Sequence, residues 1–260
     1  MKPLFYTTKN IDDISIYFEI YAKNALAEEF SNVFSDGKFT QKQDNVLVLL
    51  HGNGEDGSIF NSIVEQLSEI CYCIVPDTRG HGKTTAGTMD FTVDLLAEDL
   101  SKLCDELNLG NFRLLGFSDG GNTAITYAVR HPERLSALIA AGANINPSGL
   151  STSFLLTNRI KLAIAKASKD KNEKSNLRYQ LLSLMINHPH INPRLLRNIP
   201  CPALIMCAEK DLIKKSHTEL IASSIKNSKL ITVPDSTHDI FNTNHNFTTA
   251  AIKEFLLTVE

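Results

Sequence analysis

A serine lies among glycines in the stretch GFSDGG, with Gly116 two residues before Ser118 and Gly120 two residues after it. An apolar run, FRLLGF, leads into the serine, and a segment with helical periodicity, GNTAITYAV, follows it. An abrupt turn from strand to helix strains the backbone and crowds neighbouring side chains, so residues without a Cβ are needed on both sides. The pattern predicts a hydroxyl held above a sheet over a helix N-terminus, where a nucleophile belongs.

A serine hydroxyl needs a base to take its proton, and that base needs a carboxylate to orient it. Asp211 follows the apolar run ALIMCA, and His238 follows the run KLITVP. If both runs are strands of one parallel sheet, both side chains lie at the same carboxyl edge as Ser118. The chain order serine, aspartate, histidine is the order expected for this kind of sheet.

The sequence offers other residues for the carboxylate and for the base: Glu209, Asp235 and Asp239 for the first, and His245 for the second. Surface solvation or helix capping explains these four residues more simply. The prediction is therefore a triad of Ser118, His238 and Asp211.

The oxygen of a tetrahedral intermediate is negatively charged and must be met by two backbone N–H donors. The residue after the nucleophile, Asp119, supplies one donor. The turn HGNGED, which follows the run VLVLL, supplies Asn53 as the second donor, because Gly52 and Gly54 let the main chain fold close to a substrate. An ordinary glycine turn is the alternative interpretation of this stretch.

The composition narrows the class of protein. The chain has 260 residues, 43% of them hydrophobic, and a net charge of -3, so it has no overall field that would attract nucleic acid or an anionic membrane, although a local patch is compatible with it. No window approaches the roughly 20 apolar residues of a membrane span, and the first residues lack a secretory pattern. We expect a cytoplasmic protein whose five cysteines are buried thiols.

Short apolar runs alternate with segments of helical periodicity along most of the chain. This alternation predicts an α/β fold, in which helices cover both faces of a mostly parallel central sheet. The runs predicted as buried strands are residues 45–50, 72–77, 112–117, 135–142, 203–208 and 229–234. The segments predicted as helices are residues 58–70, 92–109, 121–132, 216–227 and 247–259. Residues 14–21, ISIYFEIY, alternate as a half-buried antiparallel strand does.

Two segments interrupt this alternation. Residues 146–199 are helix-prone without a strand signal, and we interpret them as a helical cap inserted between core residues 1–145 and 200–260. The apolar side chains of this segment predict burial against the carboxyl edge of the sheet. Residues 22–44 are polar, and we interpret them as a long loop. A helical turn within this loop is also compatible with the sequence.

The motifs LLHGNGED, PDTRGHGKT, LLGFSDGGNTAITYAVRHPERL, PALIMCAEKDLI and STHDIF follow one another in the order seen in α/β-hydrolases, which the chain resembles from about Val46 to its end. The segments GFSDGG and GANINPSGL resemble the small capped serine hydrolases of the biphenyl-hydrolase-like and esterase type. The chain departs from that pattern at Ser236, where the family commonly has glycine, and in its long 22–44 stretch.

The resemblance implies Ser118 as nucleophile, His238 as acid and base, and Asp211 as its orienting partner, with the N–H groups of Asn53 and Asp119 as oxyanion donors. We expect no cofactor. Three further residues match a segment that fixes a loop near the site, so we expect them to be structural: Asp77, Arg79 and His81. Two histidines, His188 and His190, lack a nearby carboxylate or cysteine, and we predict no metal site there.

We expect a serine hydrolase that cleaves a small, partly hydrophobic carboxylic ester through an acyl-enzyme, with no nucleic-acid partner. The same triad also cleaves amide or aminoacyl bonds, thioesters or activated carbon–carbon bonds, because the pocket selects the substrate. A noncatalytic ligand receptor on the same fold is the alternative outside the enzyme class.

Overall fold

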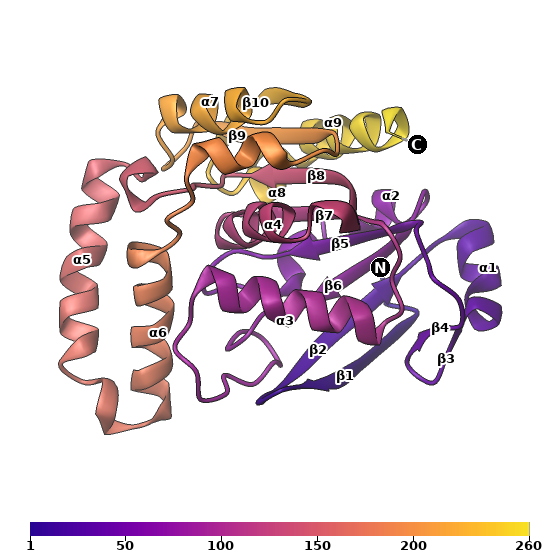
Figure 1. Ribbon diagram of the computed structural model, residues 1–260, viewed down its shortest axis with the longest axis horizontal. Coiled ribbons are helices and arrows are strands. Elements are labelled where there is room, and N and C mark those ends of the chain that lie inside the picture. Colours follow the sequence, from indigo (N-terminus) through magenta and orange to yellow (C-terminus); the bar gives the residue numbers. More distant parts are fainter. Residues whose placement is uncertain (260) are drawn as a thin grey trace.

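An eight-stranded sheet runs through the centre of the molecule (Figure 1). The computed structural model describes residues 1–259. The strand order is β1-β2-β6-β5-β7-β8-β9-β10, and only the pairs β1–β2 and β2–β6 are antiparallel. The strands are β1 (Phe5–Ile11), β2 (Ile14–Tyr21), β5 (Val46–Leu50), β6 (Tyr72–Pro76), β7 (Phe112–Phe117), β8 (Leu135–Ala141), β9 (Ala203–Lys210) and β10 (Ser228–Thr237). The predicted α/β class with a mostly parallel sheet is confirmed.

The central strands are apolar throughout because both faces of the sheet are covered. All five residues of β5 are buried, and successive side chains enter opposite cores: Val48 joins the core on one face, whereas Leu47 and Leu49 join the core on the other. The cysteines are free, buried thiols, as predicted.

Helices form a layer on each face of the sheet. Those that share one core with Val48 are α3 (Val93–Glu106), α4 (Asp119–Arg130) and α7 (Lys215–Ser224). Those on the opposite face are α2 (Val64–Leu67), α8 (Ile240–Thr243) and α9 (His245–Thr258). Thr92 caps α3 by accepting a hydrogen bond of 3.0 Å from the N–H of Leu95. Within residues 1–259, no helix is both long and apolar enough to cross a membrane.

The 146–199 segment leaves the sheet after β8 and returns to it at β9. It contains α5 (Thr152–Lys166) and α6 (Glu173–Asn187), which pack side by side at one end of the molecule (Figure 1). Phe154 of α5 and Met185 of α6 line a cavity that also contains Ser118 at the end of β7. The segment therefore lies over the carboxyl edge of the sheet.

The interpretation of residues 22–44 as a long loop was wrong. They form α1 (Asn24–Val33) and a small hairpin of β3 (Phe34–Ser35) and β4 (Lys38–Phe39). Phe34 and Phe39 are buried, and the Phe39 ring lies 5.5 Å from that of Tyr72 between centroids. Asp36 and Gly37 turn the hairpin with positive φ, so the Asp-Gly signal was present in a stretch whose polar residues concealed it.

Two other elements differ from the sequence prediction. Residues 58–70 do not form one helix: a 3-10 helix (Gly57–Phe60) and the four-residue α2 stand there instead. The edge strand β1 was not predicted, because its side chains alternate between half-buried and exposed positions and give a weak apolar signal. Neither difference moves the strands that end at the site.

Candidate active site

Ser118 occupies the turn from β7 into α4, with φ of 53° and ψ of -119°. A non-glycine residue with positive φ is strained, and such strain is typical of functional positions. A Cβ on Gly120 would overlap the carbonyl oxygen of Leu50, and a Cβ on Gly116 would overlap that of Gly120. The two glycines therefore permit the turn that presents the hydroxyl, for the reason given by the sequence.

The structure brings Ser118, His238 and Asp211 together. His238 Nε2 lies 2.9 Å from Ser118 Oγ, and His238 Nδ1 lies 2.7 Å from Asp211 Oδ1. Asp211 follows β9 and His238 follows β10, so three strand ends of one sheet meet at this point. With Nδ1–H donated to Asp211, the imidazole presents Nε2 as an acceptor for the serine proton.

The Asp211 carboxylate is held in its ionised form. Burial acts to raise its pKa, but the hydrogen bond from His238 and those from the N–H groups of Ile213 and Ala208 together lower it below the ordinary value. The two backbone donors lie 3.0 Å and 2.9 Å from the carboxylate oxygens. A fixed negative charge beside Nδ1 stabilises an imidazolium as it forms.

The alternative carboxylates make other contacts. Glu209 accepts a hydrogen bond of 2.9 Å from the N–H of Asp235, and Asp239 caps α8 by accepting one of 3.1 Å from Asn242. His245 begins α9. Among residues 1–259, none of these four side chains has a hydrogen bond to Ser118 or His238. The geometry thus favours Asp211 and His238 over their rivals.

The glycine turn lies beside Ser118. The N–H of Gly52 donates to Glu55 Oε2 at 3.0 Å, and the N–H of Gly54 donates to His81 Nε2 at 3.0 Å. In the described part of the chain, the backbone N–H groups of Asn53 and Asp119 have no hydrogen-bond acceptor. Both residues line the cavity around Ser118. The two N–H groups are thus available to a substrate oxygen.

The side chain of Asp119 has a role that the sequence analysis missed. Its two carboxylate oxygens accept hydrogen bonds from Asn53 Nδ2 at 2.8 Å and from Asn122 Nδ2 at 3.0 Å. Asn122 also donates to Asn144 Oδ1 at 3.1 Å, so the network links the glycine turn, α4 and the segment after β8. Asn53 and Asn144 are distant from α4 in the sequence, so only the fold brings them into this network, and no sequence signal marks them as part of it.

The acidity of Asp119 yields a pH-dependence prediction. Burial raises its pKa from the ordinary 3.8 to about 6, so between these pH values the folded protein holds a proton that the unfolded chain has released. Stability therefore falls as pH rises through this window, by roughly 3 kcal/mol for this group alone. We expect the free energy of unfolding of wild type minus that of Asp119→Asn to fall by most of this amount between pH 4 and pH 7, because the unfolded chain has already released part of this proton at pH 4.

Urea titrations at several pH values measure this difference, and any constant cost of the substitution cancels because only the slope matters. Parallel curves for the two proteins would show that Asp119 does not titrate in this window.

Glu55 is a second acid at the site that the sequence analysis did not single out. It lines the cavity with Ser118 and His238, and burial raises the pKa of its carboxyl group. Its hydrogen bond to Gly52 closes the turn that contains Asn53. The sequence signal that could have indicated this role is the position of Glu55 directly after Gly54 in the turn HGNGED.

The motif PDTRGHGKT fixes the loop beneath this turn. Thr78 donates from its N–H to His51 Nε2 at 3.0 Å, and Asp77 accepts from the N–H groups of Gly57 and Lys83. Burial lowers the pKa of His81 to about 4, so at neutral pH its Nε2 is the acceptor that Gly54 requires. The contacts of Asp77 and His81 agree with the expected structural role of this motif.

Three cavities lie near the 146–199 segment. The first, of about 200 Å³, surrounds Ser118 and has Leu150, Phe154, Met185 and Leu212 in its wall. The second, of about 730 Å³, continues past His238 along α5.

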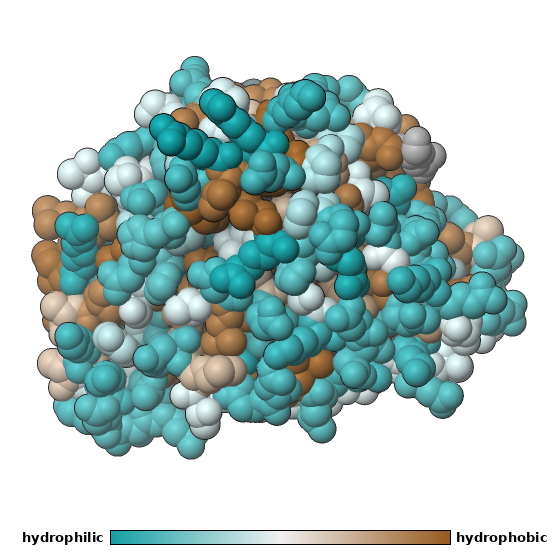
Figure 2. All heavy atoms as spheres, viewed as in Figure 1, coloured by the Kyte–Doolittle hydropathy of each residue, from teal (hydrophilic) through white to brown (hydrophobic). Residues whose placement is uncertain are grey.

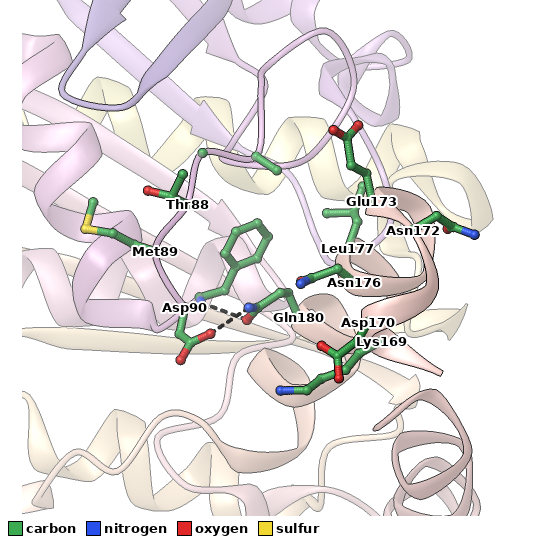
Figure 3. A pocket seen from close by; sticks show the side chains of 13 residues that line it. Thr88, Met89, Asp90, Lys169, Asp170, Asn172, Glu173, Asn176, Leu177 and Gln180 are labelled. Carbon is green, nitrogen blue, oxygen red and sulfur yellow. Dashed lines mark hydrogen bonds between the residues drawn. The ribbon is translucent and has the colours of Figure 1, made fainter. Parts of the chain in front are cut away.

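The third cavity, of about 590 Å³, lies between residues 86–91 and α6 and contains none of the triad residues (Figure 3). There Gln180 accepts from the N–H of Phe91 at 3.1 Å and donates to Asp90 at 2.7 Å. These two hydrogen bonds tie α6 to the core.

His188 and His190 lie in the connection after α6, with ring centroids 6.4 Å apart. His190 Nδ1 lies 3.2 Å from Asn146 Nδ2. Within residues 1–259, no group of three or more His, Cys, Asp or Glu side chains is arranged to hold a metal ion.

Comparison with known proteins matches residues 45–174 to the alpha/beta hydrolase fold family. The chain is 25% identical over 229 residues to the human serine hydrolase BPHL, and the matched region covers 77% of this chain and 75% of that protein. It is 35% identical over 108 residues to the pimeloyl-[acyl-carrier protein] methyl ester esterase of Aeromonas hydrophila, covering 41% of this chain and 40% of the esterase.

Solved structures show the same fold. The enol-lactonase from Burkholderia xenovorans LB400 superposes with a TM-score of 0.76 at 18% identity, covering 96% of this chain and 100% of the lactonase. A thermophilic esterase from Thermogutta terrifontis superposes with a TM-score of 0.74 at 22% identity, and the match covers 98% of this chain and 97% of the esterase. The family match, the relatives and the sheet agree: the chain belongs to the alpha/beta hydrolase fold family and is a hydrolytic enzyme.

Proposed function

We propose that the protein cleaves a small, partly hydrophobic carboxylic ester through an acyl-enzyme formed on Ser118. The observation that supports this most is the continuous hydrogen-bonded chain from Ser118 Oγ through His238 to Asp211, at 2.9 Å and 2.7 Å. A hydroxyl bonded to an imidazole that is itself oriented by a carboxylate is an activated nucleophile.

In this mechanism, Ser118 Oγ attacks the ester carbonyl carbon while His238 Nε2 takes the hydroxyl proton. The carbonyl oxygen becomes an oxyanion that accepts hydrogen bonds from the N–H groups of Asn53 and Asp119, each worth about 3–4 kcal/mol of the barrier. The carbon–oxygen bond to the alcohol then breaks, and the imidazolium returns its proton to the leaving oxygen. Water, deprotonated by His238, attacks the acyl-enzyme and releases the carboxylic acid and Ser118.

The size and lining of the inner cavity support a small substrate. About 200 Å³ around Ser118 holds only a few carbon atoms beyond the ester group, and the wall is mainly apolar. We also propose that residues 146–199 form a cap over core residues 1–145 and 200–260, since α5 and α6 supply Phe154 and Met185 to this wall. The esterase name of the Aeromonas relative favours an ester over an amide.

A substrate panel tests this proposal. We expect p-nitrophenyl acetate and butyrate to be hydrolysed with a kcat/KM at least about tenfold above that of the octanoate, because the octanoyl chain exceeds the inner cavity and must leave its apolar wall for the outer cavity, which also contains Lys161, Lys210 and Asp239. The matching anilides should react at less than about one hundredth of the ester rate, because their leaving group is poorer. Faster cleavage of anilides or thioesters than of oxygen esters would assign the triad to a different bond.

A further inference from the structure

The outward face of α5 carries a stripe of aliphatic side chains. Leu156, Ile160 and Ile164 are 61%, 58% and 60% exposed, whereas no other leucine, isoleucine or methionine of residues 1–259 exceeds 50%. They are spaced four residues apart, so they lie along one side of the helix. Figure 2 shows hydrophobic side chains gathered at the edge of the molecule where α5 lies in Figure 1.

The fold does not require this outward stripe. The opposite side of α5 makes the packing contacts: Phe154, Leu155 and Leu162 pack with buried Ile186 and Ile213. At about 100° per residue, these inward side chains lie on the other side of the helix from Leu156 and Ile160. The helix is thus apolar on two faces, and only one face is covered by protein.

Charge is concentrated around the same face. Arg159, Lys161 and Lys166 are exposed cations of α5, and the helix has no acidic residue. Across residues 152–187 there are seven Lys or Arg but only Asp170 and Glu173 as acids, in a chain whose net charge is -3. By helical position, Lys161 borders the exposed stripe on one side, and Arg159 and Lys166 border it on the other.

We propose that α5 lies on an anionic lipid surface, with Leu156, Ile160 and Ile164 in the interface and the flanking cations on lipid headgroups. An apolar stripe bordered by Lys and Arg is the pattern of helices that lie in the plane of a membrane surface. A second copy of the chain fits this face less well, because a two-fold contact would place the cations of α5 against those of its partner.

This position connects docking to the site. Thr157 and Lys161 of α5 line the outer cavity together with His238 and Asp211. An enzyme resting on α5 therefore holds the mouth of this cavity close to the lipid. The consequence for catalysis, which rests on the proposed function, is that esters dissolved in a bilayer reach Ser118 without crossing bulk water.

Co-sedimentation of the full chain with vesicles tests the docking. We expect binding to vesicles of phosphatidylcholine and phosphatidylglycerol at 7:3, and at least about tenfold weaker binding to phosphatidylcholine alone. The triple variant Leu156→Gln, Ile160→Gln, Ile164→Gln should lose at least about tenfold in affinity. A matched triple variant at exposed leucines elsewhere, Leu4→Gln, Leu220→Gln, Leu257→Gln, should bind as wild type does.

Hydrolysis of p-nitrophenyl acetate in solution provides the folding control, because the three α5 substitutions lie outside both catalytic cavities and should leave this rate unchanged. Absence of binding to anionic vesicles, or equal binding by wild type and the α5 triple variant, would overturn the proposal. A wild-type dimer in light scattering that dissociates in the triple variant would also overturn it and assign the face to a second copy.

The Ser118→Ala variant separates the two proposals. It should bind anionic vesicles as wild type does while failing to hydrolyse the ester. If Ser118→Ala binds vesicles and hydrolyses the ester as fast as wild type does, the proposed function is wrong but the docking stands. If wild type hydrolyses the ester but does not bind vesicles, the docking is wrong but the proposed function stands.

Discussion

Replacing Ser118 with alanine is expected to lower kcat for p-nitrophenyl butyrate by about 10⁴-fold to 10⁶-fold. The substitution removes the hydroxyl oxygen that lies 2.9 Å from His238 Nε2 and forms the acyl-enzyme, while the N–H groups of Asn53 and Asp119 stay in place. Residual turnover would come from those donors and from binding. KM should change by less than about threefold, because the methyl group leaves the cavity wall nearly intact.

Initial-rate kinetics on purified wild type and Ser118→Ala measure this effect. Ser153→Ala is the matched control, because Ser153 lies on α5 in the wall of the outer cavity and, within residues 1–259, its side chain has no hydrogen bond to His238. Its kcat should stay within about twofold of wild type. A loss of less than tenfold in Ser118→Ala would show that the reaction does not pass through this hydroxyl.

Replacing Asp99 with alanine is expected to destabilise the fold by about 3–5 kcal/mol. Its partner Arg79 is fully buried, and Asp99 holds the guanidinium by two hydrogen bonds of 2.8 Å from Nε and Nη2. Burial acts to lower the pKa of Arg79, but Asp99 and Asp13 raise it, so the cation persists in the interior. Without Asp99, the buried guanidinium of Arg79 loses one of its two carboxylate partners and keeps only Asp13.

Urea unfolding followed by circular dichroism measures this loss. Asp105→Ala is the control, because Asp105 forms an ion pair with Arg134 at 2.7 Å while 61% exposed, and its removal should cost less than about 1 kcal/mol. Because Arg79 lies in the loop that contains His81, Asp99→Ala should also lower esterase activity. If the Asp99 and Asp105 variants had equal free energies of unfolding, the buried Arg79–Asp99 pair would not contribute more to stability than the exposed pair, which would contradict this prediction.

Residues at strand ends could be predicted to meet because parallel strands deliver their carboxyl ends to one edge. The bounds of β7 match the predicted 112–117, and the apolar runs before Asp211 and His238 are β9 and β10. Strong apolar runs leave few alternatives for a buried strand. This is why the geometry of Ser118, His238 and Asp211 was accessible from the sequence.

Features that depend on loop paths could not be predicted in this way. The pairing of Asp119 with Asn53 and the closure of the glycine turn by Glu55 arise when distant loops pack together. Ser236 stands where the family commonly has glycine. Its side chain is buried and its hydroxyl donates to the carbonyl of Val233 at 2.6 Å, a hydrogen bond that no sequence pattern predicts. The small hairpin around Asp36 was missed because the polar residues around it concealed its Asp-Gly turn, and because the packing of Phe39 against Tyr72 is a long-range contact.

The most direct test of the proposed mechanism is covalent labelling by a fluorophosphonate, which reacts only with an activated serine, followed by intact-mass measurement. We expect wild type to gain the mass of one adduct, located on Ser118 by peptide mapping. Ser118→Ala should gain none, and His238→Ala should react at least about 100-fold more slowly, because the hydroxyl keeps its proton. An unlabelled, folded wild type, or equal labelling of Ser118→Ala, would contradict an acyl-enzyme on Ser118.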